Sequence, residues 1–198
     1  MKFYIDITLI PGVDVSYGFL WGKVYQAIHS ELVKLKDHAE KVPIGVAFPE
    51  YLNPEQRFPL GSKLRFLAAD EAGLEKLDIK KCLYCFRDYI HCTSIRTVPS
   101  DTNIKYVRYV RQHPNQSGAK LRRLIRRKAE REGVSIEVAQ EQFSEDAFEN
   151  LKTPFVRLRS GRTQQKFCLF IQKVPAERLI NEGFNTYGLS HGSTVPEF

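Results

Sequence analysis

The chain has 198 residues, of which 42% are hydrophobic and 12% aromatic, a composition typical of a folded protein with a sizeable core. A balance of 30 basic against 23 acidic residues gives a net charge of +7, which favours an anionic partner. No apolar run is long enough to cross a membrane, and the N-terminal segment MKFYIDITLIPG lacks the features of a signal peptide. Four cysteines are too few for a secreted disulfide scaffold, so we expect a cytoplasmic protein with reduced thiols.

The first half of the chain alternates between strand and helix patterns. Strands are predicted at residues 3–9, 44–48, 64–69 and 81–90, and helices at residues 16–38 and 70–77. The order βαββαβ indicates a ferredoxin-like domain over residues 1–95, with both helices on one face of the sheet. RNA-recognition domains share this topology, although topology by itself does not define a function.

The second half, residues 96–198, is expected to form a C-terminal domain, so that the whole chain is an α+β protein. Strands are predicted at residues 104–110, 155–159 and 166–172, helices at 120–132 and 135–151, and a linker at 93–101. The helix at 135–151 has an acidic outer face, a candidate surface for a protein partner, and an inward face of Ile136, Ala139, Phe143 and Ala147. The tail, GFNTYGLSHGSTVPEF, is rich in glycine and serine with embedded aromatic residues.

The most distinctive segment is KLRRLIRRKAERE, residues 120–132, in which seven of thirteen residues are basic. Leu121, Leu124, Ile125 and Ala129 recur at helical spacing, so one side of this helix docks on the protein and the rest is cationic. Ser117 is predicted to cap its N-terminus, and Gly133 stands where a C-terminal glycine stop belongs.

The charge of this helix is poorly balanced. A run of charges is usually a solvated surface, but here only Glu130 and Glu132 offset the cations, both at the C-terminal end. Because unpaired cations repel one another unless an anion arrives, we predict that the helix contacts nucleic acid. Such a helix could enter a DNA major groove or follow the phosphates of an RNA hairpin, and the segment alone does not distinguish these.

The cysteines and the histidine of residues 82–92 are the candidates for a metal site. Cys82 and Cys85 have the spacing of a zinc knuckle, but His91 and Cys92 are adjacent and cannot easily reach one metal. In the predicted strand at 81–90 the two first cysteines would also face opposite sides. The sequence contains no phosphate-binding glycine loop and no carboxylate cluster of the two-metal nuclease kind. We therefore expect neither a metal nor another cofactor.

Five segments together resemble the CRISPR-repeat-processing endoribonucleases of type I-F systems. They are GKVYQAI (22–28), IGVAFP (44–49), LRRLIRR (121–127), PFVRLRSGRTQQKFCLFI (154–171) and YGLSHGSTVPEF (187–198). The resemblance spans the chain and implies a ferredoxin-like domain followed by a domain that presents the arginine-rich helix to an RNA stem-loop. It also implies metal-independent cleavage at the 3′ base of the repeat hairpin, leaving a 2′,3′-cyclic phosphate. The product guide RNA would then stay bound within the surveillance complex, and the free protein would be a monomer.

The same resemblance implies roles for individual residues. Ser160 corresponds to the serine that positions the attacking 2′-hydroxyl, Phe167 to an aromatic residue that stacks on the closing base pair, and Tyr187 to a tyrosine near the site. Arg162 stands in the active-site loop where a small hydroxyl residue can occur, Thr163 follows it, and both are expected to bind RNA. The implied RNA-binding residues of the helix are Lys120, Arg122, Arg123, Arg126 and Arg127. Candidates for reading bases before the helix are Arg108, Arg111 and Gln112.

One position departs from the family pattern. The family's catalytic histidine follows Gly-Lys and an apolar residue, and Tyr25 occupies that position here. A tyrosine, with a pKa of about 10, is a poor base near neutral pH, whereas a histidine titrates near about 6.5. His29 lies one turn later on the same side of the predicted helix, about 5.4 Å along its axis. We hypothesise that His29 has taken over the role, with Tyr25 orienting or donating.

The sequence is also compatible with two alternatives to an endoribonuclease. The first is a stem-loop-binding subunit that caps the guide RNA but cuts slowly or not at all. The second, independent of the resemblance, is a DNA-binding or ribosomal-type protein that uses the same basic helix. Taken alone, a single histidine such as His29 is more often a surface or boundary residue than a catalyst.

Overall fold

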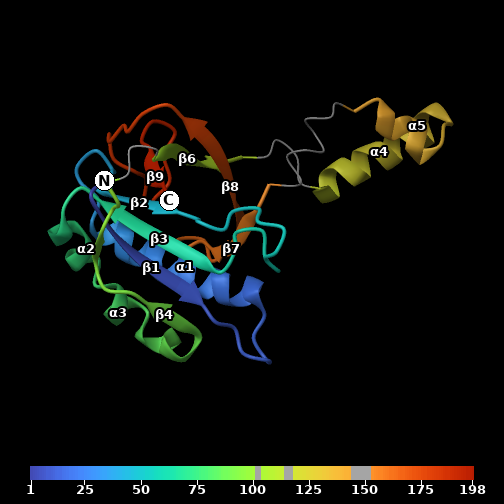
Figure 1. Ribbon diagram of the computed structural model, residues 1–198. Coiled ribbons are helices and arrows are strands. Elements are labelled where there is room, and N and C mark those ends of the chain that lie inside the picture. The colour runs from blue at the N-terminus through green and yellow to red at the C-terminus, as the bar shows by residue number, and fades with distance from the viewer. Residues whose placement is uncertain (101–103, 114–117, 144–152) are drawn as a thin grey trace. The chain divides into compact units, whose positions relative to one another are not determined.

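The computed structural model describes residues 1–100, 104–113, 118–143 and 153–198 (Figure 1). Contacts divide the chain into unit 1, residues 1–111 and 154–198, and unit 2, residues 112–153, and each unit is described by itself. These units do not follow the predicted boundary between residues 95 and 96, because residues 154–198 group with the N-terminal part. The division into domains 1–95 and 96–198 stays a prediction.

The first sheet of unit 1 is built from the N-terminal strands β1 (Phe3–Leu9), β2 (Ile44–Ala47), β3 (Lys63–Ala68) and β4 (Ile90–Cys92), with the short β5 (Arg96–Thr97) in the segment predicted as a linker. Its order is β2-β3-β1-β4, and β5 also pairs with β1. Each of these pairs is antiparallel. The predicted strands at 3–9, 44–48 and 64–69 are therefore confirmed to within one residue.

Helix α1 (Tyr17–Lys34) packs against β1 and supplies His29 to the candidate site. Its N-cap is Ser16, whose hydroxyl accepts a hydrogen bond from the Phe19 amide at 3.4 Å, and it ends four residues before the predicted end. Its buried side chains are Leu20, Trp21, Val24, Tyr25, Ile28 and Leu32. In the described part of the chain, neither α1 nor any other helix combines the length and apolarity needed to cross a membrane.

The predicted fourth strand at 81–90 is wrong for most of its length. The segment after α2 (Glu71–Leu77) forms α3 (Ile79–Cys82) and the 3₁₀ helix η1 (Tyr84–Tyr89), and only residues from Ile90 pair as β4. Asp78 explains the start, because its left-handed backbone turns the chain and its carboxylate caps the Lys81 amide at 3.4 Å. Alternating apolar residues in a short run do not by themselves distinguish strand from helix.

The cysteines of this segment are free thiols. Cys82 lies at the end of α3 and Cys85 within η1, so the expectation that they face opposite sides of a strand does not apply. Among the residues that the structure describes, no group of three or more His, Cys, Asp or Glu side chains is arranged to hold a metal ion.

The second sheet of unit 1 is formed by β6 (Lys105–Gln112), β7 (Phe155–Arg159), β8 (Lys166–Ala176) and β9 (Val195–Glu197). Its order is β7-β8-β6-β9. The three predicted strands of this half are confirmed, although β8 extends four residues further than expected. Strand β9 lies in the tail, where no strand was predicted, and pairs with β6 through Tyr106 and Pro196.

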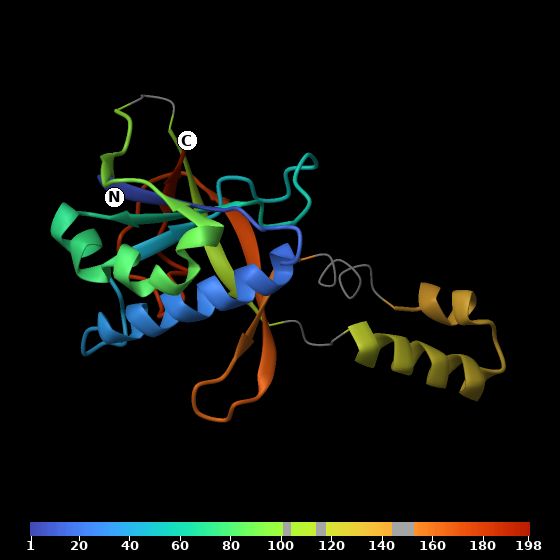
Figure 2. The same cartoon turned by 90° about the horizontal axis from the view of Figure 1, so that it is seen from below.

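The two sheets share one core, which is why the C-terminal segment belongs to unit 1 (Figure 2). Val42 and Phe184 form an isolated antiparallel bridge, and the Val46 amide donates to the Gly188 carbonyl at 2.9 Å. A Cβ at Gly45 would lie 2.7 Å from the Phe184 ring, so the close approach of these segments requires glycine at this position. The packing brings the tail against β2 and α1.

Unit 2 contains α4 (Gly118–Glu132) and α5 (Ile136–Glu141). Leu121, Ile125 and Ala129 of α4 are buried together with Ala139 of α5, which confirms the predicted docking stripe for these three residues, whereas Leu124 is only partly buried. Gly133 ends α4 with a φ of 64°, and the Val134 amide donates to the Ala129 carbonyl at 3.1 Å.

Other predictions for unit 2 are only partly met. Ile136 is 52% exposed, so its predicted inward position is wrong, because the short α5 buries only Ala139 against α4. Ser135 caps α5 as the predicted start requires. Ser117, Ala147 and the helix beyond residue 143 lie outside the described residues.

Candidate active site

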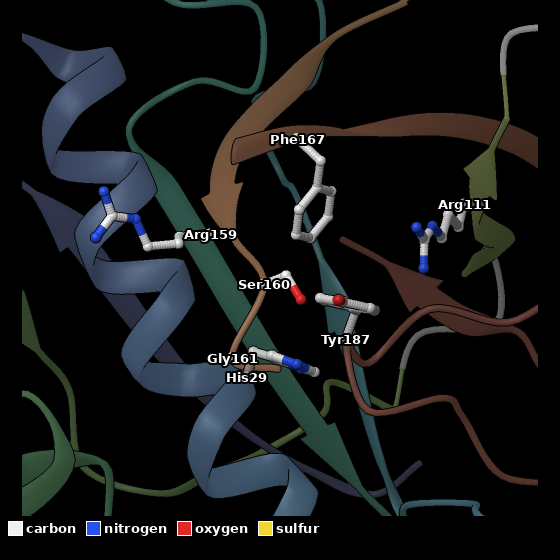
Figure 3. A pocket seen from close by; sticks show the side chains of 7 residues that line it. All are labelled: His29, Arg111, Arg159, Ser160, Gly161, Phe167 and Tyr187. Carbon is white, nitrogen blue, oxygen red and sulfur yellow. The ribbon is translucent and has the colours of Figure 1, made fainter. Parts of the chain in front are cut away.

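A pocket of about 320 Å³ in unit 1 collects side chains from four parts of the chain (Figure 3). The parts are α1, the end of β6, the β7–β8 hairpin with its turn, and the loop before β9. The pocket is lined by His29, Arg111, Arg159, Ser160, Gly161, Phe167 and Tyr187. Figure 3 shows the side chains of Ser160, Phe167 and Tyr187 pointing towards one another, with His29 beside Tyr187.

His29 is held in a defined orientation. Its Nδ1 lies 2.8 Å from the Thr186 carbonyl oxygen, and its ring stacks on Tyr187 with 4.0 Å between centroids and 9° between planes. Because a carbonyl oxygen can only accept, Nδ1 carries the hydrogen. The neutral imidazole therefore keeps its lone pair on Nε2, the nitrogen free to take a proton.

The surroundings of His29 favour its neutral form. Burial lowers its pKa below the ordinary value, the hydrogen bond to Thr186 opposes this, and the nearby Arg111 guanidinium lowers it further. A lowered pKa keeps His29 uncharged at neutral pH, the state in which it can act as a base.

Although His29, one turn later on the same helix, lines the pocket, Tyr25 lies in the core. Its side chain is fully buried and stacks near Phe48, and its hydroxyl donates to the Tyr187 carbonyl at 2.8 Å. Burial raises its pKa far above the ordinary value. Tyr25 is therefore not placed to be a base. Its hydrogen bond anchors the loop whose Thr186 carbonyl contacts His29.

That loop, residues 185–188, is a tight turn built around an asparagine. The Asn185 side-chain oxygen accepts hydrogen bonds from the amides of Tyr187 at 2.9 Å and Leu189 at 3.2 Å. Gly188 closes the turn with a φ of 72°, and a Cβ there would lie 2.2 Å from a Val46 methyl carbon. The turn is thereby fixed against β2, with the carbonyls of Thr186 and Tyr187 facing α1.

We predict that Gly188→Ala destabilises the protein by roughly 2–4 kcal/mol, since it combines backbone strain with overpacking against Val46. Chemical denaturation measures this directly. Gly161→Ala is the matched control, because a Cβ at Gly161 meets nothing within 4 Å and should change stability by less than about 0.5 kcal/mol. Equal stability of the two variants would contradict the fixed position of the turn.

Ser160 begins the turn that joins β7 to β8. The Thr163 amide donates to the Ser160 hydroxyl oxygen at 3.2 Å, and the Gln164 amide donates to the Ser160 carbonyl at 2.9 Å. The preceding Arg159 amide donates to the side-chain oxygen of Gln26 at 2.9 Å, which ties this turn to α1. With its oxygen already accepting, the Ser160 hydroxyl keeps its hydrogen available for a ligand in the pocket.

Arg111 is one of the two arginines that line the pocket. Its guanidinium carbon lies 5.8 Å from the Phe167 ring centroid and 5.4 Å from that of Tyr187. It forms no salt bridge with any other residue in the described ranges. An unpaired guanidinium beside a neutral histidine and a serine is suited to an anionic group such as a phosphate.

The other residues predicted for RNA binding lie away from this pocket or in the second unit. Arg162 and Thr163 are exposed on the β7–β8 turn, and the Arg108 guanidinium donates to the His191 carbonyl at 3.0 Å. Gln112 belongs to unit 2, where it accepts a hydrogen bond from the Thr153 hydroxyl at 2.8 Å. The sequence interpretation missed Arg159 and the supporting residues Gln26, Asn185 and Thr186, and only the Asn-x-x-Gly turn signal could have pointed to one of them.

Helix α4 presents the predicted cationic surface within unit 2. Arg122, Arg123, Arg126 and Arg127 are all exposed. Of the described arginines on α4, only Arg131 forms a salt bridge, with Glu132 at 3.0 Å. Lys120 falls within the bounds of α4.

The fold and the pocket define a mixed α/β protein in which a histidine, a serine and an arginine without a salt bridge line one pocket. Comparison with known proteins identifies the family: residues 4–198 match the family described as CRISPR-associated protein (Cas_Csy4), and the chain belongs to it. A relative from Pseudomonas aeruginosa (strain UCBPP-PA14), named CRISPR-associated endonuclease Cas6/Csy4, is 33% identical over the full length of both chains. A second relative of the same name, from Escherichia coli (strain UTI89 / UPEC), is 27% identical over the full length of both.

Solved structures give a weaker likeness. One, described as an RAMP protein binding different RNA substrates, covers both chains completely with 13% identity and a TM-score of 0.40. Another, described as CRISPR associated protein Cas6, covers 100% of this chain and 99% of that one with 10% identity and a TM-score of 0.40.

Proposed function

We propose that this protein is an endoribonuclease that processes CRISPR repeat RNA, and that the pocket around His29 is its active site. Its family and the names of its full-length relatives support this. The observation that carries the proposal is the placement of His29, which has one fixed tautomer and lines the same pocket as Ser160 and Arg111. The protein binds the repeat stem-loop, cleaves at its 3′ base without a metal ion and leaves a 2′,3′-cyclic phosphate.

The reaction needs one proton removed and one supplied. The 2′-oxygen of the nucleotide before the cut attacks phosphorus, its proton passes to Nε2 of His29, and the bond from phosphorus to the 5′-oxygen breaks. The imidazolium then returns a proton to the departing 5′-oxygen, so His29 finishes neutral. Positioned acid–base groups of this kind contribute about 100- to 10,000-fold to rate.

Other pocket residues assist this step. Ser160 donates a hydrogen bond that orients the attacking 2′-hydroxyl, and the Arg111 guanidinium balances charge that develops on the phosphate oxygens. Phe167 stacks on the closing base pair of the stem, while Tyr187 keeps the His29 ring in place. Tyr25 acts through the loop that it anchors and does not exchange a proton.

The stem itself is held by the arginines of α4, because exposed unpaired guanidinium groups suit a phosphate backbone. Unit 1 contains a ferredoxin-like domain, which the strand order β2-β3-β1-β4 and the antiparallel pairing support. After cleavage the protein, a cytoplasmic monomer when free, stays on the guide RNA and joins the other subunits of the type I-F surveillance complex. The α5 surface is the candidate contact.

The pH dependence of cleavage tests this assignment. If neutral His29 is the base, the single-turnover rate in EDTA should rise with pH and level off, with its midpoint below about 6.5 because the pKa of His29 is lowered. Rates of cleavage of the host's own repeat RNA between about pH 4.5 and 10 measure the midpoint. A rate that keeps rising towards pH 10 would point to a tyrosine and contradict the assignment.

A binding subunit without chemistry is the competing interpretation. It predicts tight stem-loop binding with no cleavage at any pH, and the same assay decides between the two. Competition between hairpin RNA and duplex DNA excludes or supports a DNA-binding role.

A further inference from the structure

The outward face of the β7–β8 hairpin carries cations and aromatic rings that the proposed reaction does not use. Antiparallel register places three pairs on this face: Phe155 opposite Phe170, Arg157 opposite Cys168 and Arg159 opposite Lys166. We call these six residues the hairpin platform. The alternate residues Val156, Leu158, Leu169 and Ile171 are buried on the opposite face.

The platform is open to solvent and electropositive. Arg157, Arg159 and Lys166 are exposed, and Phe155 and Phe170 are partly exposed. None of the three cations forms a salt bridge with another described residue, and neither strand contains an acidic residue. A basic strand surface of this kind is poorly balanced unless an anion covers it.

Aromatic rings and cations are interleaved along the platform. The Phe155 and Phe170 rings lie 5.3 Å apart, and the Arg157 guanidinium carbon is 5.7 Å from the Phe155 centroid. Rings on which bases stack, beside cations that follow the phosphates, are the combination used to bind single-stranded nucleic acid. Apolar protein partners would leave these cations desolvated without counterions, which disfavours them.

The platform is continuous with the pocket. Arg159 lines the pocket, and its side chain extends away from the other lining side chains (Figure 3). Gly161 also lines the pocket and carries no side chain, and a Cβ there would meet nothing within 4 Å. From Arg159 to Phe155 the strand spans about 13 Å, which accommodates roughly four stacked nucleotides.

We propose that the hairpin platform binds the single-stranded RNA that continues from the stem next to the scissile bond. The inference rests on the proposed function, because it assumes that the stem-loop occupies the protein. The hairpin platform would recognise the bases and phosphates of a 5′ or a 3′ single strand in the same way. The experiment below shows which of the two strands it binds. The inference predicts that flanking single-stranded RNA increases the affinity of the protein for the repeat RNA, whatever the base sequence of the flank.

Two exposed cysteines allow a footprint on the complete protein. Cys168 lies within the platform, whereas Cys85 lies in η1 and serves as the internal control, both being exposed free thiols. Alkylation by iodoacetamide is followed by mass spectrometry with the host's repeat hairpin alone, with a 5′ extension, or with a 3′ extension. A 2′-deoxy substitution at the cut prevents cleavage.

The expected result is that one extension slows alkylation of Cys168 about tenfold while Cys85 is unchanged, and that the flankless hairpin protects neither. The same extension should tighten binding roughly tenfold, the effect of about one stacked base. Arg157→Glu should abolish this gain without changing affinity for the flankless hairpin. Arg87→Glu is the matched control, since Arg87 lies over the exposed Tyr84 ring in η1 and should keep the gain.

Several outcomes would overturn the inference. If the repeat RNA hairpin binds but neither RNA extension protects Cys168 or tightens binding, the hairpin platform does not hold RNA and the proposed function stands. If Cys168 is protected only after other CRISPR-associated proteins are added, the platform is a protein interface. If even the flankless hairpin fails to bind, the proposed function fails as well.

Discussion

His29→Ala is expected to lower the single-turnover cleavage rate about 100- to 10,000-fold while leaving stem-loop affinity nearly unchanged. The reason is geometric: Nδ1 donates to the Thr186 carbonyl, so Nε2 is the basic atom that His29 presents. The measurement is cleavage of the host's repeat RNA in EDTA, with binding measured in parallel by filter retention.

Two variants make this test specific. His91→Ala removes an exposed histidine on β4 that does not line the pocket, and it should cut at the normal rate. Tyr25→Phe leaves the Tyr187 carbonyl without its donor, which should cost roughly 1–3 kcal/mol of stability and slow cleavage less than His29→Ala does. Cleavage lost in Tyr25→Phe but kept in His29→Ala would make the tyrosine the catalyst and refute the relocated histidine.

The double variant Arg126→Ala and Arg127→Ala should weaken stem-loop binding about 100-fold, because two charge-assisted contacts to phosphate are removed. Affinity measured at several salt concentrations gives a second readout. We expect the wild-type log–log slope to be about −3 to −5, for roughly 4 to 6 phosphate contacts, and the variant slope to be shallower by about 1.5.

Arg131→Ala is the control within the same helix, since Arg131 is already paired with Glu132. It should change binding and salt slope little. Circular dichroism distinguishes lost contacts from lost structure, because the arginines are exposed and their removal should preserve helicity. A flat salt response of the wild type, or helicity lost in the double variant, would contradict an RNA-binding role for α4.

The sequence was informative where one side chain pattern determines one local structure. Alternation predicted β1, and the apolar stripe and Gly133 predicted α4 and its end, because burial on one side and a left-handed stop are local requirements. The strand prediction for residues 81–90 is wrong because contacts outside the segment determine its structure. Its alternating apolar residues fit a strand, but the Asp78 turn and contacts with α1 make it helical.

By itself, the sequence determined the family through the order of its segments, the charge of α4 and the candidates His29, Ser160, Phe167 and Tyr187. Only the tertiary structure distinguished the surroundings of Tyr25 and His29, because it buries the first in the core and places the second in the pocket. The two residues lie one helical turn apart, but packing against Phe48 buries Tyr25, and the 185–188 turn fixes the imidazole of His29 in the pocket. That choice depends on contacts across more than 150 positions of the chain, such as the one between His29 and Thr186. Helical spacing specifies which residues lie side by side, while burial and the hydrogen-bond partner determine which of them can carry a proton.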